Sequence, residues 1–191
     1  GVPSSFNMYN GNQYAMGVTS DAIYSGNSPT TCPAAPAGGL GCNGNVLTPL
    51  QLTESWGFRG AFNHNWDPYW STSLFGGYSS VRYDGTVGDL TTAKGIYCAA
   101  FGASHPGQGV SYTCDPNFNV AQVGVVTRWT PVKNLTFSAE VGAFFLDQKM
   151  GSVGGAPATS TFSPGAPKPA AVYEFKDQST VYLNVRAQRN F

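Results

Sequence analysis

Hydrophobic and polar residues alternate along much of this chain, and the C-terminal segment shows the alternation most clearly. Val181, Leu183, Val185 and Ala187 occupy every second position there, and polar residues fill the positions between them. Successive side chains of a β-strand point to opposite faces. This period of two therefore predicts a strand with one apolar face and one polar face.

The same period of two recurs along the chain and predicts further strands. We place them at residues 13–24, 52–66, 70–83, 118–130 and 135–145, with a weaker strand at 1–9. Tight turns are predicted at 10–12, 67–69 and 130–134, and long connections at about 25–50, 84–116 and 151–173. Because short and long connections alternate, we expect the short turns at one end of the sheet and the long loops at the other.

Two all-β folds fit this alternation. In a soluble β-sandwich the apolar face of each strand points into the core, whereas in a membrane β-barrel it faces lipid and the polar face lines a lumen. The segregation of loop lengths favours the barrel, in which short periplasmic turns alternate with long extracellular loops. The sequence therefore predicts an all-β, antiparallel transmembrane β-barrel, with residues 1–191 forming a single domain.

Aromatic residues support the barrel interpretation, because Trp and Tyr favour the membrane–water interface. Trp56 and Trp66 lie on one face, ten positions apart, which spans roughly 25 Å along the axis of a barrel with tilted strands. That distance matches the height of an apolar band with an aromatic residue at each edge. The predicted aromatic girdle consists of Trp56, Trp66, Trp70, Trp129 and Phe191.

Composition and charge agree with a surface that partly faces lipid. Charged residues make up 10% of the chain, against roughly 25% in soluble domains, and the formal net charge is zero. The zero net charge argues against a nucleic-acid partner, because binding phosphates requires a basic surface. No apolar run has the length of a transmembrane helix, and no signal segment follows Gly1, so we expect a mature, processed or incomplete chain.

The four cysteines fall in two close pairs within segments rich in Gly, Pro, Ser and Thr. Of three possible connectivities, we favour Cys32 with Cys42 and Cys98 with Cys114, because each bond then closes one local loop. Disulfides indicate an oxidising compartment, and the alternative is free thiols in a cytosolic protein. The chain has no C-x-x-C motif, so we expect no metal site, and no motif indicates a cofactor or a catalytic group.

The chain ends in Phe191 and there resembles many bacterial outer-membrane proteins, in which a terminal aromatic residue is an assembly signal. The stretches 56–62 (WGFRGAF), 65–70 (NWDPYW) and 123–131 (VGVVTRWTP) resemble the general-diffusion porins of alphaproteobacteria. This resemblance implies a sixteen-stranded barrel that assembles as a homotrimer in the outer membrane, in contact with lipid and lipopolysaccharide. Our strand count assigns about six or seven C-terminal strands to this chain, so we expect an N-terminal portion to precede residue 1.

The polar faces of the predicted strands supply the candidate pore-lining residues. They are Arg59, Arg128, Glu140, Tyr182, Asn184 and Arg186. Basic residues on one wall, opposite acidic residues on an inward loop, set up a transverse field that selects solutes by charge. The alternative is that the arginines pair with Glu140 or with the backbone and have no part in selection.

These features predict an outer-membrane porin through which ions and small hydrophilic solutes diffuse passively, without covalent chemistry. The alternative is a secreted, soluble, disulfide-containing β-sandwich that binds a ligand through its loops and stays monodisperse without detergent. A third hypothesis is an outer-membrane enzyme on a smaller barrel, although no Ser-His-Asp set has a motif to support it.

Overall fold

The computed structural model describes residues 4–23, 50–104, 112–152, 158–162 and 169–190. The chain divides into two compact units. The first unit comprises Gly1–Ser55, Val81–Phe118 and Asp147–Gln178, and the second comprises Trp56–Ser80, Asn119–Leu146 and Ser179–Phe191. Each unit is described by itself, and the single domain expected from the sequence stays a prediction.

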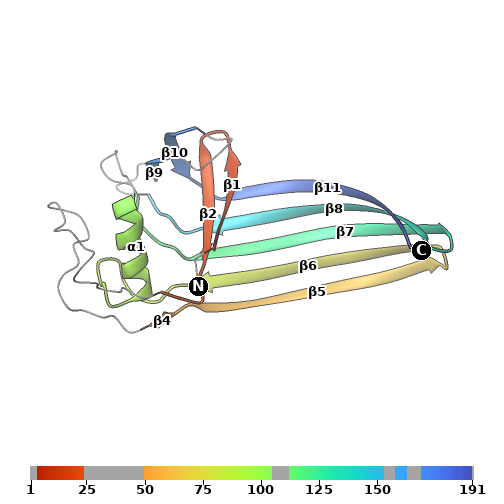
Figure 1. Ribbon diagram of the computed structural model, residues 1–191, viewed down its shortest axis with the longest axis horizontal. Helices are drawn as coiled ribbons and strands as arrows, with labels where there is room; N and C mark the ends of the chain where they lie inside the picture. Colours follow the sequence, from red (N-terminus) through yellow and green to blue (C-terminus); the bar gives the residue numbers. More distant parts are fainter. Residues whose placement is uncertain (1–3, 24–49, 105–111, 153–157, 163–168, 191) are drawn as a thin grey trace. The chain divides into compact units, whose positions relative to one another are not determined.

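Five long strands form one antiparallel sheet in the order β11-β8-β7-β6-β5 (Figure 1). The strands are β5 (Glu54–Asp67), β6 (Trp70–Arg82), β7 (Phe118–Val132), β8 (Leu135–Gln148) and β11 (Gln178–Arg189). Each has 12 to 15 residues, more than the about 9–11 that a tilted strand needs to cross a bilayer. The five corresponding strands predicted from the alternation are therefore confirmed.

Two tight turns join neighbouring strands of this sheet. Pro68 and Tyr69 connect β5 to β6, and the Asp67 carboxylate accepts a hydrogen bond from the Tyr69 backbone N–H at 2.7 Å. Asn134, in the turn between β7 and β8, has a φ of 69°, a left-handed conformation that asparagine adopts more readily than most residues. By connectivity, both turns lie at one end of the sheet and the long connections leave from the other end, as the sequence predicts.

The first unit contains a four-stranded sheet in the order β1-β2-β10-β9, a short β3-β4 pair and the helix α1. The bounds are β1 (Ser4–Asn10), β2 (Gln13–Thr19), β3 (Ala22–Ile23), β4 (Gln51–Leu52), α1 (Ala93–Ser104), β9 (Thr159–Phe162) and β10 (Ala171–Phe175). β1 and β2 form an antiparallel hairpin whose turn includes Gly11 at a φ of 58°, which confirms the turn predicted at 10–12. β10 runs parallel to β2 and antiparallel to β9.

Aromatic and sulfur-containing side chains dominate the core of the first unit. Its buried members are Tyr14, Met16, Cys98, Cys114, Met150, Ala158, Tyr173 and Phe175. Tyr97 and Phe101 of α1 pack against this cluster, with their ring centroids 5.8 Å apart. A disulfide joins Cys98 to Cys114, which confirms one predicted pair, whereas Cys32 and Cys42 lie outside the described residues.

The strand predicted at 13–24 does not belong to the long sheet. Tyr14, Ala15 and Met16 are buried in succession, so this segment lacks one open face, and β2 pairs with β1 and β10 instead. Within the described part of the chain, the long sheet therefore has five strands, fewer than the six or seven expected. The alternation in 13–24 reflects a packed core rather than a boundary between lipid and water.

The sequence predicts loops at 84–116 and 151–173, but these segments contain α1 and the strands β9 and β10. Two glycines, Gly95 and Gly102, lower the helix propensity of α1, so composition alone does not reveal it. A helix start signal is present, because Thr92 Oγ1 accepts a hydrogen bond from the Gly95 N–H at 3.3 Å, as an N-cap residue does. Gly95 is also required sterically, since an added Cβ would lie 1.9 Å from the Asp89 carbonyl oxygen.

Candidate functional site

One face of the five-stranded sheet is apolar and lies open on the surface. On β11, Val181, Leu183 and Val185 are 75%, 69% and 72% exposed. Neighbouring strands add further exposed apolar side chains, namely Phe58, Phe62, Leu74, Val123, Val125, Val141 and Phe145. So large an apolar surface indicates a non-aqueous partner. A soluble sandwich would bury this face in its core, so the exposure argues against that alternative.

Indole rings lie on the apolar face near the tight turns. Trp66, Trp70 and Trp129 are exposed, and the Trp70 and Trp129 ring centroids are 6.5 Å apart. The Trp66 indole N–H donates a hydrogen bond to Thr72 Oγ1 at 3.0 Å. Each ring therefore combines an apolar body with a polar group near the end of the sheet, as the membrane interface favours.

Trp56 lies near the other end of β5, where its ring centroid is 5.5 Å from that of Tyr78. The two ends of the strand thus both carry exposed tryptophan, in line with the predicted girdle. Phe191 lies outside the described residues, and the role of the girdle stays a prediction.

The opposite face carries polar side chains that bond across strands. The Arg128 guanidinium on β7 donates to Ser73 Oγ on β6 at 2.8 Å, and Ser73 donates to Asn63 Oδ1 on β5 at 2.6 Å. Asn63 Nδ2 donates in turn to Asn65 Oδ1 at 3.1 Å. These bonds cross three strands and hold the charge of Arg128 against the wall of the sheet.

A second network lies on the same face, toward β11. Gln122 Nε2 on β7 donates to the Tyr182 hydroxyl at 2.8 Å, and Tyr182 donates to Glu140 Oε1 on β8 at 2.9 Å. In the described part of the chain, Glu140 thus accepts from a phenol and forms no ion pair with an arginine. The arginines and Glu140 remain separate polar groups on this face.

Two aromatic rings on the polar face lie over glycines of neighbouring strands. A Cβ added to Gly142 would come within 2.5 Å of the Tyr182 ring, and one added to Gly124 would come within 2.5 Å of the Phe75 ring. Glycine at these two positions therefore lets each ring approach the adjacent backbone closely.

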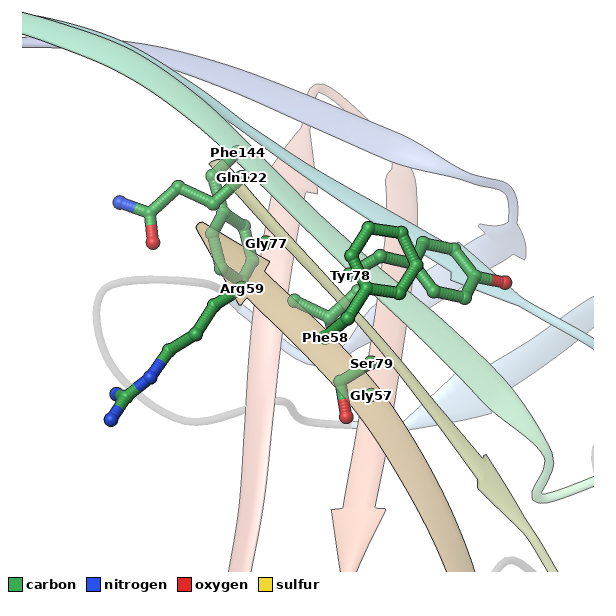
Figure 2. A pocket seen from close by; sticks show the side chains of 9 residues that line it. Gly57, Phe58, Arg59, Gly77, Tyr78, Ser79, Gln122 and Phe144 are labelled. Carbon is green, nitrogen blue, oxygen red and sulfur yellow. The ribbon is translucent and has the colours of Figure 1, made fainter. Parts of the chain in front are cut away.

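Arg59 borders a hollow in the polar face. The hollow has a volume of about 370 Å³ and is lined by Gly57, Phe58, Arg59, Gly77, Tyr78, Ser79, Val120, Gln122 and Phe144. Figure 2 shows the side chains of Arg59 and Gln122 on one side of the strands and the rings of Phe58 and Tyr78 on the other. The Arg59 guanidinium makes no hydrogen bond or ion pair with any described residue.

Asn184 and Arg186 lie on β11 at positions that alternate with the exposed valines. Both side chains are exposed. The structure thus places all six predicted pore-lining residues on strands of one sheet, and brings Tyr182 and Glu140 into contact. Their role in a pore stays a prediction.

The six predicted pore-lining residues leave out several residues of the polar face. Asn63, Ser73 and Gln122 carry the cross-strand hydrogen bonds, and the alternation places them on that face; Gln122, for example, lies six positions before Arg128. Parity also places Phe75, two positions after Ser73, and Phe144, four positions after Glu140, on this face. Residue type alone would have assigned both phenylalanines to the apolar face.

The first unit contains a partly buried carboxyl group. Burial raises the pKa of the Asp177 carboxyl, the nearby Asp147 carboxylate raises it further, and a hydrogen bond from the Gln148 N–H at 3.1 Å opposes the rise. Lys149 bonds both carboxylate oxygens of Asp147 at 2.8 Å. In the ranges that the structure describes, no three His, Cys, Asp or Glu side chains gather as a metal site would require.

A sheet with one exposed apolar face, one hydrogen-bonded polar face and tight turns at one end is typical of the wall of a transmembrane β-barrel. Among the described residues, no helix is both long and apolar enough to cross a membrane. The sequence profile described as porin subfamily matches residues 4–184, and the chain belongs to that family. No curated protein and no solved structure matches the chain.

Membership of this family confirms the predicted porin. It supports an outer-membrane channel without enzymatic chemistry in general terms. The alphaproteobacterial origin, the homotrimer and the position at the C-terminal end of a larger barrel stay predictions.

Proposed function

We propose that the five-stranded sheet is part of the wall of a water-filled outer-membrane pore, through which ions and small hydrophilic solutes diffuse passively. The observation that carries this proposal is the contrast between adjacent residues of β11. Leu183 is 69% exposed on the apolar face, while Tyr182 donates a hydrogen bond to Glu140 on the other. Such a strand is most stable between hydrocarbon and water.

Further strands must complete the pore. Among the strands that the structure describes, β5 and β11 form the two edges of the sheet. An unpaired edge in lipid leaves backbone N–H and C=O groups without partners, at a cost of several kcal/mol each. We infer that other strands pair with these edges, and the resemblance to general-diffusion porins favours a sixteen-stranded barrel in a homotrimer. Lipid and lipopolysaccharide would then cover the apolar face.

The polar face is suited to water and to small polar solutes. Arg128, Glu140 and Tyr182 are held by cross-strand hydrogen bonds, whereas Arg59 and Arg186 have no partner among the described residues and keep their guanidinium groups available to solutes. Three arginines outweigh one glutamate among the six candidate pore-lining residues, so this section of the wall attracts anions.

We place the ends of the strands opposite to the tight turns outside the cell, because outer-membrane barrels carry their long loops there. The connection between β6 and β7 contains α1 and the Cys98–Cys114 disulfide, and the connection between β8 and β11 contains β9 and β10. A disulfide in one of these connections fits an oxidising environment.

Planar-bilayer recording tests the proposed pore. The purified protein should give stepwise conductance in KCl, and liposomes that contain it should swell more slowly as the sugar outside grows larger. Asn184→Trp, on the polar face, should lower the unit conductance, whereas Val185→Trp, on the apolar face, should leave it unchanged. Folded, detergent-stable protein that gives neither conductance nor swelling would refute the proposal.

A further inference from the structure

The hollow beside Arg59 has a chemistry that simple diffusion does not require. Its volume of about 370 Å³ lies at the low end of the roughly 300–1,000 Å³ of small-molecule sites. Residues of four adjacent strands, β5 to β8, line it, and Arg59 and Gln122 extend from the same side of these strands (Figure 2). The hollow is therefore a feature of the polar face, where a solute would pass.

Two glycines that line this hollow let β5 and β6 approach each other closely. A Cβ added to Gly57 would lie 2.7 Å from the Tyr78 carbonyl oxygen, and one added to Gly77 would lie 3.3 Å from the Arg59 Cβ. Any other residue would therefore crowd these two positions.

Arg59 supplies the cationic group of the hollow. Arg128, on the same face, is bound to Ser73, whereas Arg59 has no partner among the described residues. A guanidinium without an internal partner keeps its planar set of N–H donors for a ligand, and that set matches the two oxygens of a carboxylate.

Phe144 and Val120 give the same hollow an apolar side. An inorganic anion or a short aliphatic carboxylate would use Arg59 but leave Phe144 exposed to water. A ligand that joins a carboxylate to an aromatic ring satisfies both sides, because aromatic rings attract each other in offset-stacked or edge-on arrangements.

We propose that this hollow binds small aromatic carboxylates of the benzoate class, with the carboxylate on Arg59 and the ring against Phe144. The inference rests on the proposed pore function, because the ligand reaches the polar face through the lumen. Binding inside a pore must be weak enough to allow release, so we expect half-saturation in the millimolar range.

Two measurements on the purified protein test this site. In single-channel recording, sodium benzoate added to KCl should reduce the current with a saturating, millimolar dependence, whereas sodium acetate and benzamide should have a much smaller effect. Ligand-detected NMR with benzoate, on the same protein in detergent, reports binding without requiring conduction.

Matched arginine variants separate the site from a general effect of charge. Arg59→Gln should weaken the benzoate effect roughly tenfold or more, because it removes charge-assisted hydrogen bonds. Arg186→Gln removes a charge from the same face but lies outside the hollow, and should weaken the benzoate effect far less than Arg59→Gln does. Phe144→Ala should weaken benzoate without altering the response to acetate.

The outcomes distinguish this inference from the proposed pore. Normal KCl conductance with no benzoate binding by NMR would overturn the inference alone, as would equal effects of benzoate and acetate or equal losses in the two arginine variants. If the protein binds benzoate in a way that depends on Arg59 but shows no conductance, the proposed pore would be refuted and the proposed binding site would be supported.

Discussion

A lysine placed on either face of β11 tests which side of the sheet contacts lipid. Leu183 and Asn184 are neighbours near the middle of the strand, five and six residues after Gln178. Because they point to opposite faces, Leu183→Lys and Asn184→Lys place the same charge at nearly the same depth in two different solvents. The pair therefore compares the two faces at nearly the same depth and with the same introduced residue, and only Leu183→Lys also removes an apolar side chain.

The cost of the two substitutions should differ widely. Lysine on the lipid face near the bilayer midplane costs about 2–4 kcal/mol, and loss of a largely lipid-exposed leucine adds about 1.5–3 kcal/mol. Leu183→Lys should therefore lower the free energy of unfolding by about 3.5–7 kcal/mol. Asn184→Lys places its ammonium group in water and should change that free energy by less than about 1 kcal/mol.

Denaturant unfolding in lipid vesicles measures this difference. Tryptophan fluorescence and the heat-dependent mobility of the folded protein on gels report the extent of unfolding. A gap of about 4 kcal/mol corresponds to roughly a thousandfold change in the folding equilibrium constant, well above the error of such titrations. Equal costs for the two lysines would refute the assignment of the apolar face to lipid, and a larger cost for Asn184→Lys would reverse it.

Three further predictions concern other parts of the chain. Cys98→Ser removes a disulfide between cysteines 16 residues apart and should lower the stability of the first unit by about 3 kcal/mol. Proteolysis near α1 should become faster, and treating the wild-type protein with reductant should accelerate it to the same extent. Tyr182→Phe removes two cross-strand hydrogen bonds and should cost about 1–3 kcal/mol in the same vesicle titration; an unchanged midpoint would contradict those bonds. The pKa of Asp177 is raised in the folded state, so the native state binds more protons than the unfolded state and stability should fall as pH rises from about 4 through the raised pKa. Asp177→Asn should abolish this fall and exceed the wild type in stability at pH 7; the opposite pH trend would show that burial does not disfavour the charged form.

The long strands were predictable because each of their faces has the same environment along the whole strand. One face of β11 is apolar and open along its length, so Val181, Leu183 and Val185 repeat with a period of two that no local packing disturbs. The first unit lacks this property. Tyr14, Ala15 and Met16 in β2 are all buried, so no period of two appears there. Gly95 and Gly102 lower the helix propensity of α1, so the sequence does not indicate this helix.

The candidate site was predictable only as a set of positions on one face. Parity identified Arg59, Arg128 and Tyr182, but the partner of each depends on how neighbouring strands are aligned. That Tyr182 bonds Gln122 and Glu140, or that Arg59 remains without a partner among the described residues, depends on cross-strand register. Turn geometry and connection length fix this register together with the hydrophobic pattern, whereas the alternation within one strand shows only which side chains share a face.

The rings that lie over glycines have a consequence for the bore of the proposed channel. The Tyr182 ring occupies space that a Cβ at Gly142 would fill, and the Phe75 ring occupies space that a Cβ at Gly124 would fill. Both bulky side chains therefore lie close to the wall. One extra methyl group at either glycine would lift a ring toward the axis and narrow the passage without adding or removing a charge. The width of the passage and its preference for anions would then depend on separate residues, and each could be altered alone.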